Sequence, residues 1–404
     1  MRSRRPTHFL AAAVLLVACV PEESPLYPPP PPVSSSLAIG AVAPSASAAG
    51  APVSFAPAVA LAAGSGTTCA LLADGEVACW GVGVGVTPVA MPALKGAKQL
   101  AMHTAHSFAI LGDGAVLAWG RNDHGELGDG TKENQKVPVA VPQLKGAQQI
   151  APGGGHTCAL DAGGAVRCWG FDGMGELGDG ESSETEKIRV PERPILRDVK
   201  SIDAGTYFAC ALAAKDGSVR CWGAGTNGQT GTDEMVTQSP RLIKGLHDVK
   251  QLVLGGVHAC ALLGDGTVKC WGANSDGQIG NGATKEDAHA PTKVVSLGGV
   301  QKLALGETHS CATLGDGTVR CWGSNHQGQL GTGDTVSKST PVEVKGLKDV
   351  TALSLGKNHS CAIVRDGAVW CWGDNNLGEL GDGTTDDRYA PTRVKWSPGA
   401  PVAP

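Results

Sequence analysis

Cysteine is the residue type with the most evident chemistry in this chain of 404 residues. Twelve of its 13 cysteines form six pairs whose members are ten or eleven positions apart. Each pair brackets a short strand, a turn such as Asp265-Gly266 and a returning strand, which places the two side chains opposite one another on one face. Such a pair can close a disulfide if it is a close, non-hydrogen-bonded one. The predicted disulfides join Cys69 with Cys79, Cys158 with Cys168, Cys210 with Cys221, Cys260 with Cys270, Cys311 with Cys321, and Cys361 with Cys371.

Two other roles are possible for these cysteines. They could stay in the reduced thiol form and pack beside tryptophan, or they could ligate zinc. In the second unit Phe108 and Ala118 stand at the two cysteine positions, so both partners are lost together. Neither alternative requires a joint loss, and the spacing is not that of a zinc knuckle. Together with the export signal described below, the pattern favours disulfides.

Histidine also recurs, two residues before the first cysteine or its substitute, in five units. The residues are His106, His156, His258, His309 and His359. A ring of imidazoles could bind a metal or an anion. Thr67 and Phe208 interrupt the series, however, and a residue repeated so often is explained more simply by a local hydrogen-bond bridge. We therefore predict neither a metal nor a cofactor.

The remaining motifs do not indicate an enzyme. The loops Gly-Glu-Leu-Gly-Asp-Gly at residues 125–130, 175–180 and 378–383 are acidic, but they lack the Asp-x-Asp spacing and terminal Glu of a calcium loop. The chain has no Gly-x-Ser-x-Gly elbow, metalloprotease helix motif or phosphate loop. We expect a noncatalytic protein. The alternative is a polysaccharide or peptide hydrolase or lyase whose carboxylates come together from separate units.

The start of the chain has the order of a secretory signal. Arg2, Arg4 and Arg5 precede an apolar run over residues 9–18, which Cys19 follows. Leu16-Val17-Ala18-Cys19 resembles a bacterial lipobox, which implies a lipid on Cys19; the alternative is an ordinary signal peptide with an incidental cysteine. The prediction is an extracytoplasmic, lipid-anchored protein, with the outer membrane or cell surface favoured.

Composition divides the rest of the chain. Residues 19–52 are rich in Pro, Ala and Ser and predict a disordered tether; residues 53–396 form the folded part, and residues 397–404 a disordered tail. Without residues 1–18 the chain has 30 basic and 38 acidic residues, a formal charge of -8. This balance disfavours nucleic acid as a partner, because affinity there comes mainly from Lys and Arg.

Trp-Gly dipeptides mark seven repeats at a period near 50 residues. They begin at Trp80, Trp119, Trp169, Trp222, Trp271, Trp322 and Trp372. A repeat of this length with four short β segments is typical of a propeller blade. The predicted fold class is therefore all-β, a seven-bladed β-propeller.

The phase of the repeats suggests how the ring closes. Each unit opens with a proline-led strand, as at Pro341-Val-Glu-Val344, but the first unit lacks this strand, and Pro391-Thr-Arg-Val394 has no hairpin after it. We predict that this C-terminal strand completes the first blade and removes an open sheet edge. The alternative to closure is an open solenoid with frayed ends.

The second half of each unit identifies a family resemblance. The segments Trp271-Gly-Ala-Asn-Ser-Asp-Gly-Gln-Ile-Gly-Asn-Gly282 and Trp322-Gly-Ser-Asn-His-Gln-Gly-Gln-Leu-Gly-Thr-Gly333 resemble the repeat of the regulator of chromosome condensation family. The resemblance implies a β-propeller. The family's best-known member exchanges nucleotide on a small nuclear GTPase and binds chromatin; export, acidity and disulfides argue against that role here. Secreted bacterial proteins of similar build, which inhibit β-lactamases, are a closer analogy.

Segments that differ between the units are not required by the blade and are candidates for recognition. They are residues 181–189, 232–238, 285–289 and 385–389, and all follow the Gly-x-Gly stretch, so they should share one rim. We predict that a partner protein or envelope polymer binds there; the alternative is that these are solvated connections. The candidate partner-binding residues are Glu184, Glu186, Asp233, Met235, Asp287, His289, Arg388 and Tyr389.

Overall fold

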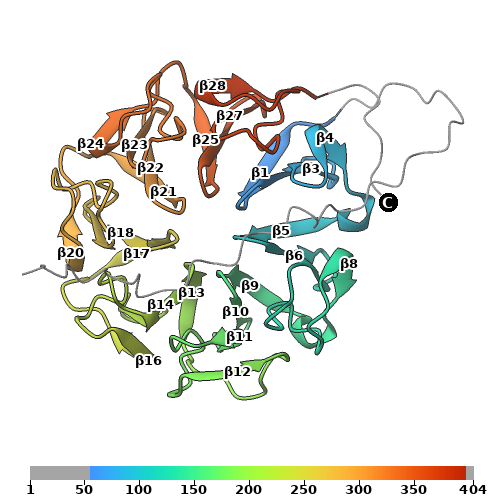
Figure 1. Cartoon of the computed structure of the whole chain (residues 1–404), viewed down its shortest axis with the longest axis vertical. Helices are drawn as coiled ribbons and strands as arrows, with labels where there is room; N and C mark the ends of the chain where they lie inside the picture. The colour runs from blue at the N-terminus through green and yellow to red at the C-terminus, as the bar shows by residue number, and fades with distance from the viewer. Residues whose placement is uncertain (1–54, 397–404) are drawn as a thin grey trace, which may run out of the picture. The chain divides into compact units, whose positions relative to one another are not determined.

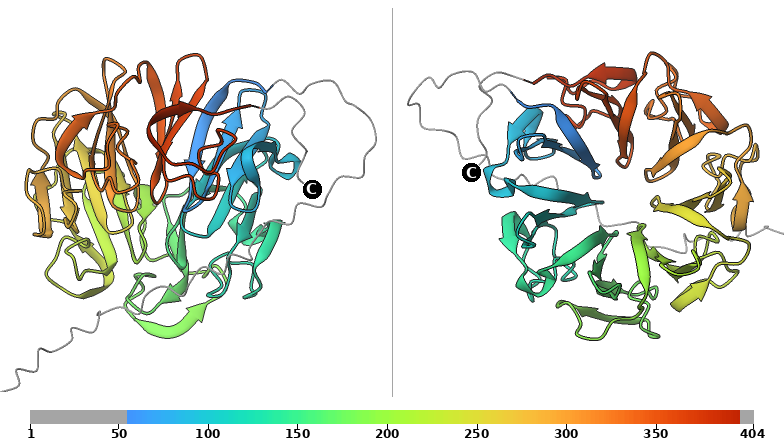
Figure 2. Two further views of the ribbon diagram at one scale, coloured as in Figure 1. Left: turned by 45° about the horizontal axis from the view of Figure 1, so that its top comes forward. Right: turned by 180° about the vertical axis from the view of Figure 1, so that it is seen from behind.

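Each repeat folds into a four-stranded antiparallel sheet in the computed structural model, which describes residues 55–396 apart from the side chains of residues 183–186. Seven such sheets, the blades, form a ring (Figure 1), and the tilted and reverse views show the same ring (Figure 2). Residues of the first strand of every blade line a central channel. The prediction of an all-β, seven-bladed propeller is confirmed. The only helical segments within residues 55–396 are two single 3-10 turns, η1 (Pro92–Leu94) and η2 (Pro142–Leu144).

Within every blade the first strand lines the channel and the fourth lies at the outer edge. The strands are β1 (Ala58–Ala63), β2 (Thr67–Leu72), β3 (Val77–Gly81) and β4 (Gly85–Ala90); β5 (Ala97–Met102), β6 (His106–Leu111), β7 (Val116–Gly120) and β8 (Gln135–Ala140); β9 (Ala147–Pro152), β10 (His156–Asp161), β11 (Val166–Asp172) and β12 (Ser183–Lys187); β13 (Val199–Ala204), β14 (Phe208–Ala213), β15 (Val219–Ala224) and β16 (Val236–Leu242); β17 (Val249–Leu254), β18 (His258–Leu263), β19 (Val268–Gly272) and β20 (Ala288–Lys293); β21 (Val300–Leu305), β22 (His309–Leu314), β23 (Val319–Gly323) and β24 (Lys338–Glu343); β25 (Val350–Leu355), β26 (His359–Val364), β27 (Val369–Gly373) and β28 (Arg388–Arg393).

The predicted closure by strand exchange is wrong. The C-terminal strand β28 pairs with β27 in the last blade, and the first blade is complete with β1 to β4. The proline-led segment is the last strand of its own unit, so neither end of the chain lacks a strand. Pro88, Pro341 and Pro391 all lie in fourth strands, where a residue without an N–H leaves no partner unsatisfied because the edge faces no further strand.

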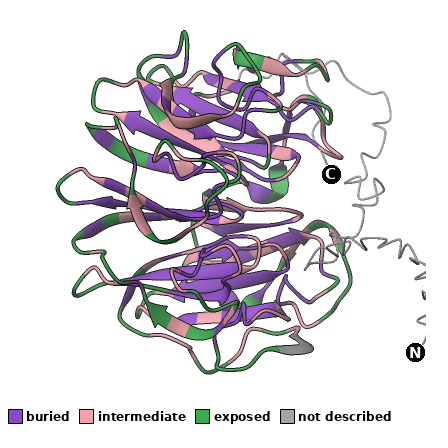
Figure 3. Cartoon of the chain, turned by 60° about the vertical axis from the view of Figure 1, so that its left-hand side comes forward, coloured by how far each residue is buried: buried purple, intermediate pink, exposed green. Residues whose placement is uncertain are grey.

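Side-chain packing closes the ring instead. One buried cluster contains Trp80 and Leu72 of the first blade together with Leu380 and Val394 of the last. The other six clusters likewise combine residues of two neighbouring blades. Figure 3 shows buried strands inside the blades and exposed residues in the connections and along outer strands. Each blade therefore depends on its neighbours for its core.

Several predicted segments lie outside the described residues. They are the signal at residues 1–18 with the tether at residues 19–52, including the lipidation candidate Cys19, and the tail at residues 397–404.

Candidate functional site

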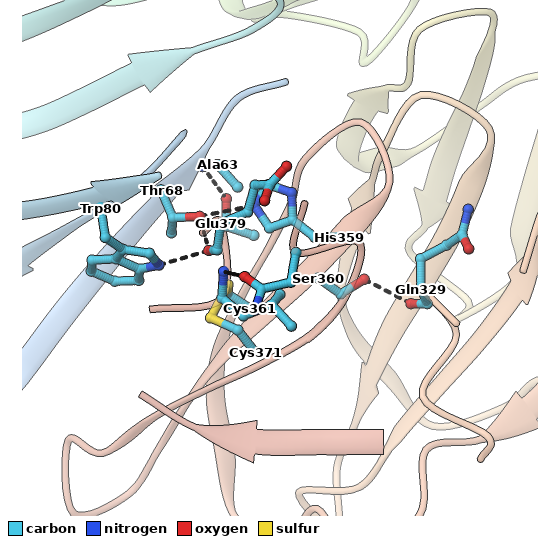
Figure 4. The surroundings of a disulfide bond; sticks show 12 residues. Ala63, Thr68, Trp80, Gln329, His359, Ser360, Cys361, Cys371 and Glu379 are labelled. Carbon is cyan, nitrogen blue, oxygen red and sulfur yellow. Dashed lines mark hydrogen bonds between the residues drawn. A yellow bond between two sulfur atoms is a disulfide. The ribbon is translucent and has the colours of Figure 1, made fainter. Parts of the chain in front are cut away.

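The loop between the third and fourth strands of one blade binds the tryptophan of the next. At the closure of the ring, Trp80 Nε1 donates to the carbonyl oxygen of Glu379 at 2.7 Å, and Thr68 Oγ1 donates to the same oxygen at 3.1 Å (Figure 4). We call this contact the inter-blade clasp. The tryptophan bond recurs in Trp169 to Glu126, Trp222 to Glu176, Trp271 to Gln229, Trp322 to Gln278 and Trp372 to Gln329.

The repeated histidines support the clasp. His359 Nε2 is hydrogen-bonded to Thr68 Oγ1 at 2.8 Å across the first and last blades. The same bond joins His106 to Thr157, His258 to Ser310 and His309 to Ser360. This is the bridging role predicted from the sequence. No group of three or more metal-ligating side chains converges within residues 55–396.

Disulfides form within all six cysteine pairs. They join Cys69 to Cys79, Cys158 to Cys168, Cys210 to Cys221, Cys260 to Cys270, Cys311 to Cys321, and Cys361 to Cys371. The two members of each pair lie at directly opposed register positions, with Cα atoms 4.0 to 4.1 Å apart. All twelve cysteines are buried in the clusters between blades. Each disulfide therefore joins two strands of one blade, packs against the neighbouring blade, and leaves no thiol at the surface of the described ring.

The second blade shows what replaces a disulfide. Phe108 and Ala118 are opposed in the same register and are fully buried. An aromatic ring thus fills the space of the missing bond, and the packing between blades is kept.

The clasp loops also bury carboxyl groups. Glu176 is fully buried, and one carboxyl oxygen accepts the Met174 N–H at 2.7 Å, while the other has no partner within the described chain. Burial raises the pKa of Glu176 to about 8 and that of Glu379 to about 7. Gln229, Gln278 and Gln329 stand at the same repeat position and accept the same backbone N–H without carrying a charge.

We expect Glu176→Gln to stabilise the protein increasingly as the pH rises. Between the unfolded value near 4.5 and about 8, the folded protein holds a proton that the unfolded chain releases, so stability falls as pH rises through this window. At about 1.4 kcal/mol per pKa unit, the gain reaches the order of 5 kcal/mol at pH 9. Urea unfolding followed by tryptophan fluorescence at pH 5 and pH 9 measures it. Gln278→Glu is the matched control and should give a loss that grows with pH; equal effects at both pH values would contradict this account.

Most polar side chains in the channel bind the edges of the inner strands. Gln149 and Gln251 each pair with both backbone groups of a residue in the next blade, Ile202 and Leu303 respectively. Asp203 accepts the Leu254 N–H at 2.8 Å, and burial raises the pKa of Asp203 to about 6. These groups satisfy strand edges that would otherwise be left unpaired.

One mouth of the channel carries charged and imidazole side chains. The cavity there has a volume of about 320 Å³ and is lined by His103, Glu307 and Lys357, among others. Glu307 reaches across two blades and accepts the hydroxyl of Thr206 at 3.0 Å. Burial lowers the pKa of His103, and the charge of Glu307 partly opposes that shift. The arrangement offers one cation, one carboxylate and one imidazole to a polar group that enters the mouth.

The sequence analysis missed these mouth residues, although the repeats contain their signal. His103 stands where the other six units have glycine, namely Gly64, Gly153, Gly205, Gly255, Gly306 and Gly356. Glu307 is similarly unmatched at the following position. Comparing the units position by position would have singled both out.

The channel mouth and the variable loops share one face. Because the third strands of all blades run in the same direction, the loops that follow them emerge on the same side as the connections between first and second strands, which carry His103 and Glu307. We call this the loop-bearing face. Its exposed apolar side chains include Met235, Val336, Leu377 and Tyr389; the sequence analysis did not select Val336 and Leu377.

Four of the predicted partner-binding residues lie on this face with accessible side chains. Met235 and Tyr389 are 58% and 45% exposed. His289 and Asp233 form an exposed pair, with Nδ1 and Oδ1 3.1 Å apart. These residues come from the fourth, fifth and seventh blades, so the structure places them around the ring and not in one cluster.

The other predicted residues do not offer free side chains, or are not described. Asp287 accepts the Asn227 amide and the Asn274 backbone N–H, both at 2.9 Å, and so organises its loop. Arg388 binds Asp382 at 2.7 Å and Thr384 at 3.0 Å. Glu184 and Glu186 lie in β12, and their side chains are outside the described part of the chain.

Comparison with known proteins agrees with this architecture. A family model described as RCC1-like domain matches residues 86–402, and one described as regulator of chromosome condensation (RCC1) repeat matches residues 58–83. The Ultraviolet-B receptor UVR8 of Arabidopsis thaliana is 31% identical over 40% of this chain and 37% of its own length. The mouse probable E3 ubiquitin-protein ligase HERC4 is 38% identical over 58% of this chain and 23% of its own length.

Solved structures share the fold at low identity. Prp20p from Saccharomyces cerevisiae aligns with a TM-score of 0.71 and 22% identity, covering 86% of this chain and 88% of that one. Human WBSCR16 aligns with a TM-score of 0.69 and 24% identity, covering 77% and 85%. The chain spans less than two fifths of the length of the curated relatives it matches.

Proposed function

Because the chain belongs to the RCC1-like domain family, we propose that its propeller binds a partner protein through the loop-bearing face. One observation carries the proposal: Met235, Val336, Leu377 and Tyr389 expose 45 to 60% of their surface on that face. Interfaces are enriched in such apolar and aromatic anchors.

The solved relatives support a binding role of this kind. The structure of yeast Prp20p was described with its binding properties to Gsp1p and histones, and yeast RCC1 was solved bound to Kap60. We carry over protein binding and not the partners. The formal charge of -5 and the expected export still predict no nucleic acid and no nucleotide-exchange role.

The proposed place of action is outside the cytoplasm. Six disulfides indicate an oxidising compartment. Nowhere in residues 55–396 is there a helix long and apolar enough to cross a membrane. We propose that a lipid on Cys19 holds the propeller at a membrane surface through residues 20–52, with the outer membrane or cell surface favoured.

We also propose that binding involves no catalysis. The two carboxylates that line the described channel, Asp203 and Glu307, are each engaged in hydrogen bonds, to backbone N–H groups and to Thr206 respectively. A hydrolase or lyase would need a carboxylate pair or a nucleophile and base aimed at one substrate atom. His103 and Glu307 are the groups to substitute if activity on an envelope polymer is ever measured.

Capture from envelope extract tests the binding face. The full-length chain is immobilised beside the triple variant Met235→Ser, Leu377→Ser and Tyr389→Ser. We expect the unaltered chain to retain a partner and the variant to bind it at least tenfold more weakly, because a few apolar anchors carry most of the binding energy of an interface. Quantitative mass spectrometry of the retained proteins provides the measurement.

A matched control separates loss of the face from loss of apolar surface in general. Val59 and Leu242 are 54% and 50% exposed and lie at strand ends remote from the loop-bearing face. The double variant Val59→Ser and Leu242→Ser should retain the partner like the unaltered chain. If both variants retained the partner equally well, the proposal would be refuted.

A further inference from the structure

One junction of the ring lacks the inter-blade clasp. Six tryptophans donate to a clasp carbonyl, but Trp119 of the second blade does not, because the first blade connects β3 and β4 by the short turn at residues 82–84. The other blades have a Gly-(Glu/Gln)-x-Gly loop at this point. We call the place between the first and second blades the open junction and define it by Ser107, Trp119 and the carbonyl of Lys136.

The six closed junctions show what such a place binds. A loop carbonyl accepts the indole N–H, and at four junctions it also accepts a Thr or Ser hydroxyl. The next loop residue is buried at every closed junction; it is Leu127, Leu177, Thr230, Ile279, Leu330 or Leu380. At five of the junctions the last glycine of the loop also donates its N–H to a carbonyl in or just beyond the neighbouring outer strand, as from Gly333 to Tyr389 at 2.8 Å.

The open junction keeps the receiving groups without the loop. Trp119 and Ser107 are 5% and 7% exposed, whereas their counterparts in the other six junctions are all 0% exposed. No hydrogen bond to Trp119 Nε1 or Ser107 Oγ forms within residues 55–396, and the Lys136 carbonyl receives no loop N–H. Val84 packs against the cluster of Trp119 but supplies no carbonyl to it. Neither donor is among the buried polar atoms without a partner in the described ring, so both are open to solvent and accessible to an incoming carbonyl.

We propose that the open junction binds a loop of the type Gly-(Glu/Gln)-(Leu/Ile)-Gly-x-Gly presented by a partner protein. The carbonyl of the second residue would accept from Trp119 and Ser107, and the Leu or Ile side chain would cover the indole. The first residue must be glycine, because at closed junctions a Cβ there would lie 2.5 to 3.0 Å from the outer-strand backbone, as between Gly125 and Ile188.

The occupant is a different protein and not a second copy. All six clasp loops of the chain are already bound within their own ring. A second copy could offer one only by opening its own propeller. The open junction lies at the loop-bearing face, so this inference rests on the proposed function and specifies its mode of recognition.

A peptide taken from the chain itself provides the probe. Residues 323–338, cyclised head to tail, contain the loop around Gln329 and Leu330, and the paired register of Gly323 with Lys338 places the ends together. Asn325 holds this loop from inside, accepting the Leu330 N–H at 2.9 Å and donating to Thr332 and Asp334. The peptide is therefore pre-organised, which lowers the entropy lost on binding.

Fluorescence polarisation of the labelled peptide against the full-length chain is the test. We expect saturable binding that weakens about tenfold with the double variant Ser107→Ala and Trp119→Phe, which removes both donors and keeps an aromatic ring, and at least tenfold with Leu330→Ser in the peptide. Replacing residues 82–84 by residues 324–337 should fill the junction internally, abolish peptide binding and raise the unfolding temperature. This second variant keeps the test sound if the first folds poorly.

Several outcomes would overturn the inference. They are absence of saturable binding, equal affinity for the unaltered and the substituted chains, and an affinity that rises when residues 19–52 are deleted, which would assign the junction to the chain's own N-terminal segment. Failure here is distinct from failure of the proposed function. If a partner is captured through the loop-bearing face but the peptide does not bind, only the proposal for the open junction is refuted. If the peptide binds but no partner is captured, only the proposal for the loop-bearing face is refuted.

Discussion

Reduction of the six disulfides is expected to abolish the folded propeller at 25 °C. Each disulfide closes a loop of 10 or 11 residues, which in the chain-entropy model contributes about 2.5 kcal/mol. Six of them contribute ~15 kcal/mol, as much as the whole net stability of a typical domain. The protein is reduced in denaturant, returned to buffer with reductant, and compared with the oxidised protein by tryptophan fluorescence and circular dichroism.

The second blade provides the control for this prediction. Phe108 and Ala118 replace a disulfide there without loss of the blade. The double variant Cys158→Phe and Cys168→Ala should therefore keep the fold, at a cost of about 2.5 kcal/mol for one lost disulfide. A reduced protein that unfolds cooperatively within a few degrees of the oxidised one would refute a stabilising role for the six bonds.

Acid is expected to unfold the protein steeply below pH 6.5 because of its buried histidines. Burial lowers the pKa of His156, His258 and His309 to about 3 and that of His359 to about 4. The histidines of the unfolded chain have a pKa near 6.5, so below this pH the unfolded chain takes up protons that the folded protein does not. The stability that the buried histidines contribute is therefore fully present above pH 6.5 and is lost as the pH falls. Each buried imidazole lowers the free energy of unfolding by up to about 1.4 kcal/mol per pH unit in this range. The buried glutamates act in the opposite direction, so stability should peak near pH 6.5 in urea unfolding midpoints.

One junction of the chain supplies the matched variant. Phe208 occupies the histidine position of the fourth blade, and Ala259 replaces the hydroxyl partner in the fifth. The ring of Phe208 lies over Gly205 as that of His309 lies over Gly306. The double variant His309→Phe and Ser360→Ala should lose stability less steeply below pH 6.5, by the contribution of one histidine. An unchanged slope between pH 6.5 and 4 would show that histidine titration does not cause the acid unfolding.

Much of the fold could be predicted because the same strand and turn pattern occurs in seven units of the sequence. The Cys-to-Cys hairpins, the seven units and the bridging histidines are local features whose partners lie within one or two blades. The closure was mispredicted because the proline-led strand can be counted either as the first strand of a unit or as the last. Sequence spacing is identical in both cases, and only the pairing of β28 with β27 distinguishes them.

The candidate site was predicted in part, for a related reason. Met235 and Tyr389 are large side chains with apolar surface in otherwise polar stretches, a signal visible in sequence, and both are exposed. Arg388 looks equally free in sequence, yet Asp382 and Thr384 bind it, because the loop folds back on itself. Exposure depends on neighbours that are several residues away, which residue type does not reveal.

By itself, the sequence determined the number of blades, the cysteine pairs and the rim that varies, because these follow from period, spacing and the contrast between repeats. The tertiary structure alone decided which strand ends the ring, which carboxyls lose their charge through burial, and which junction is left open. These properties arise between blades, where a residue's partner is set by packing across about 50 positions of sequence and not by the residues beside it.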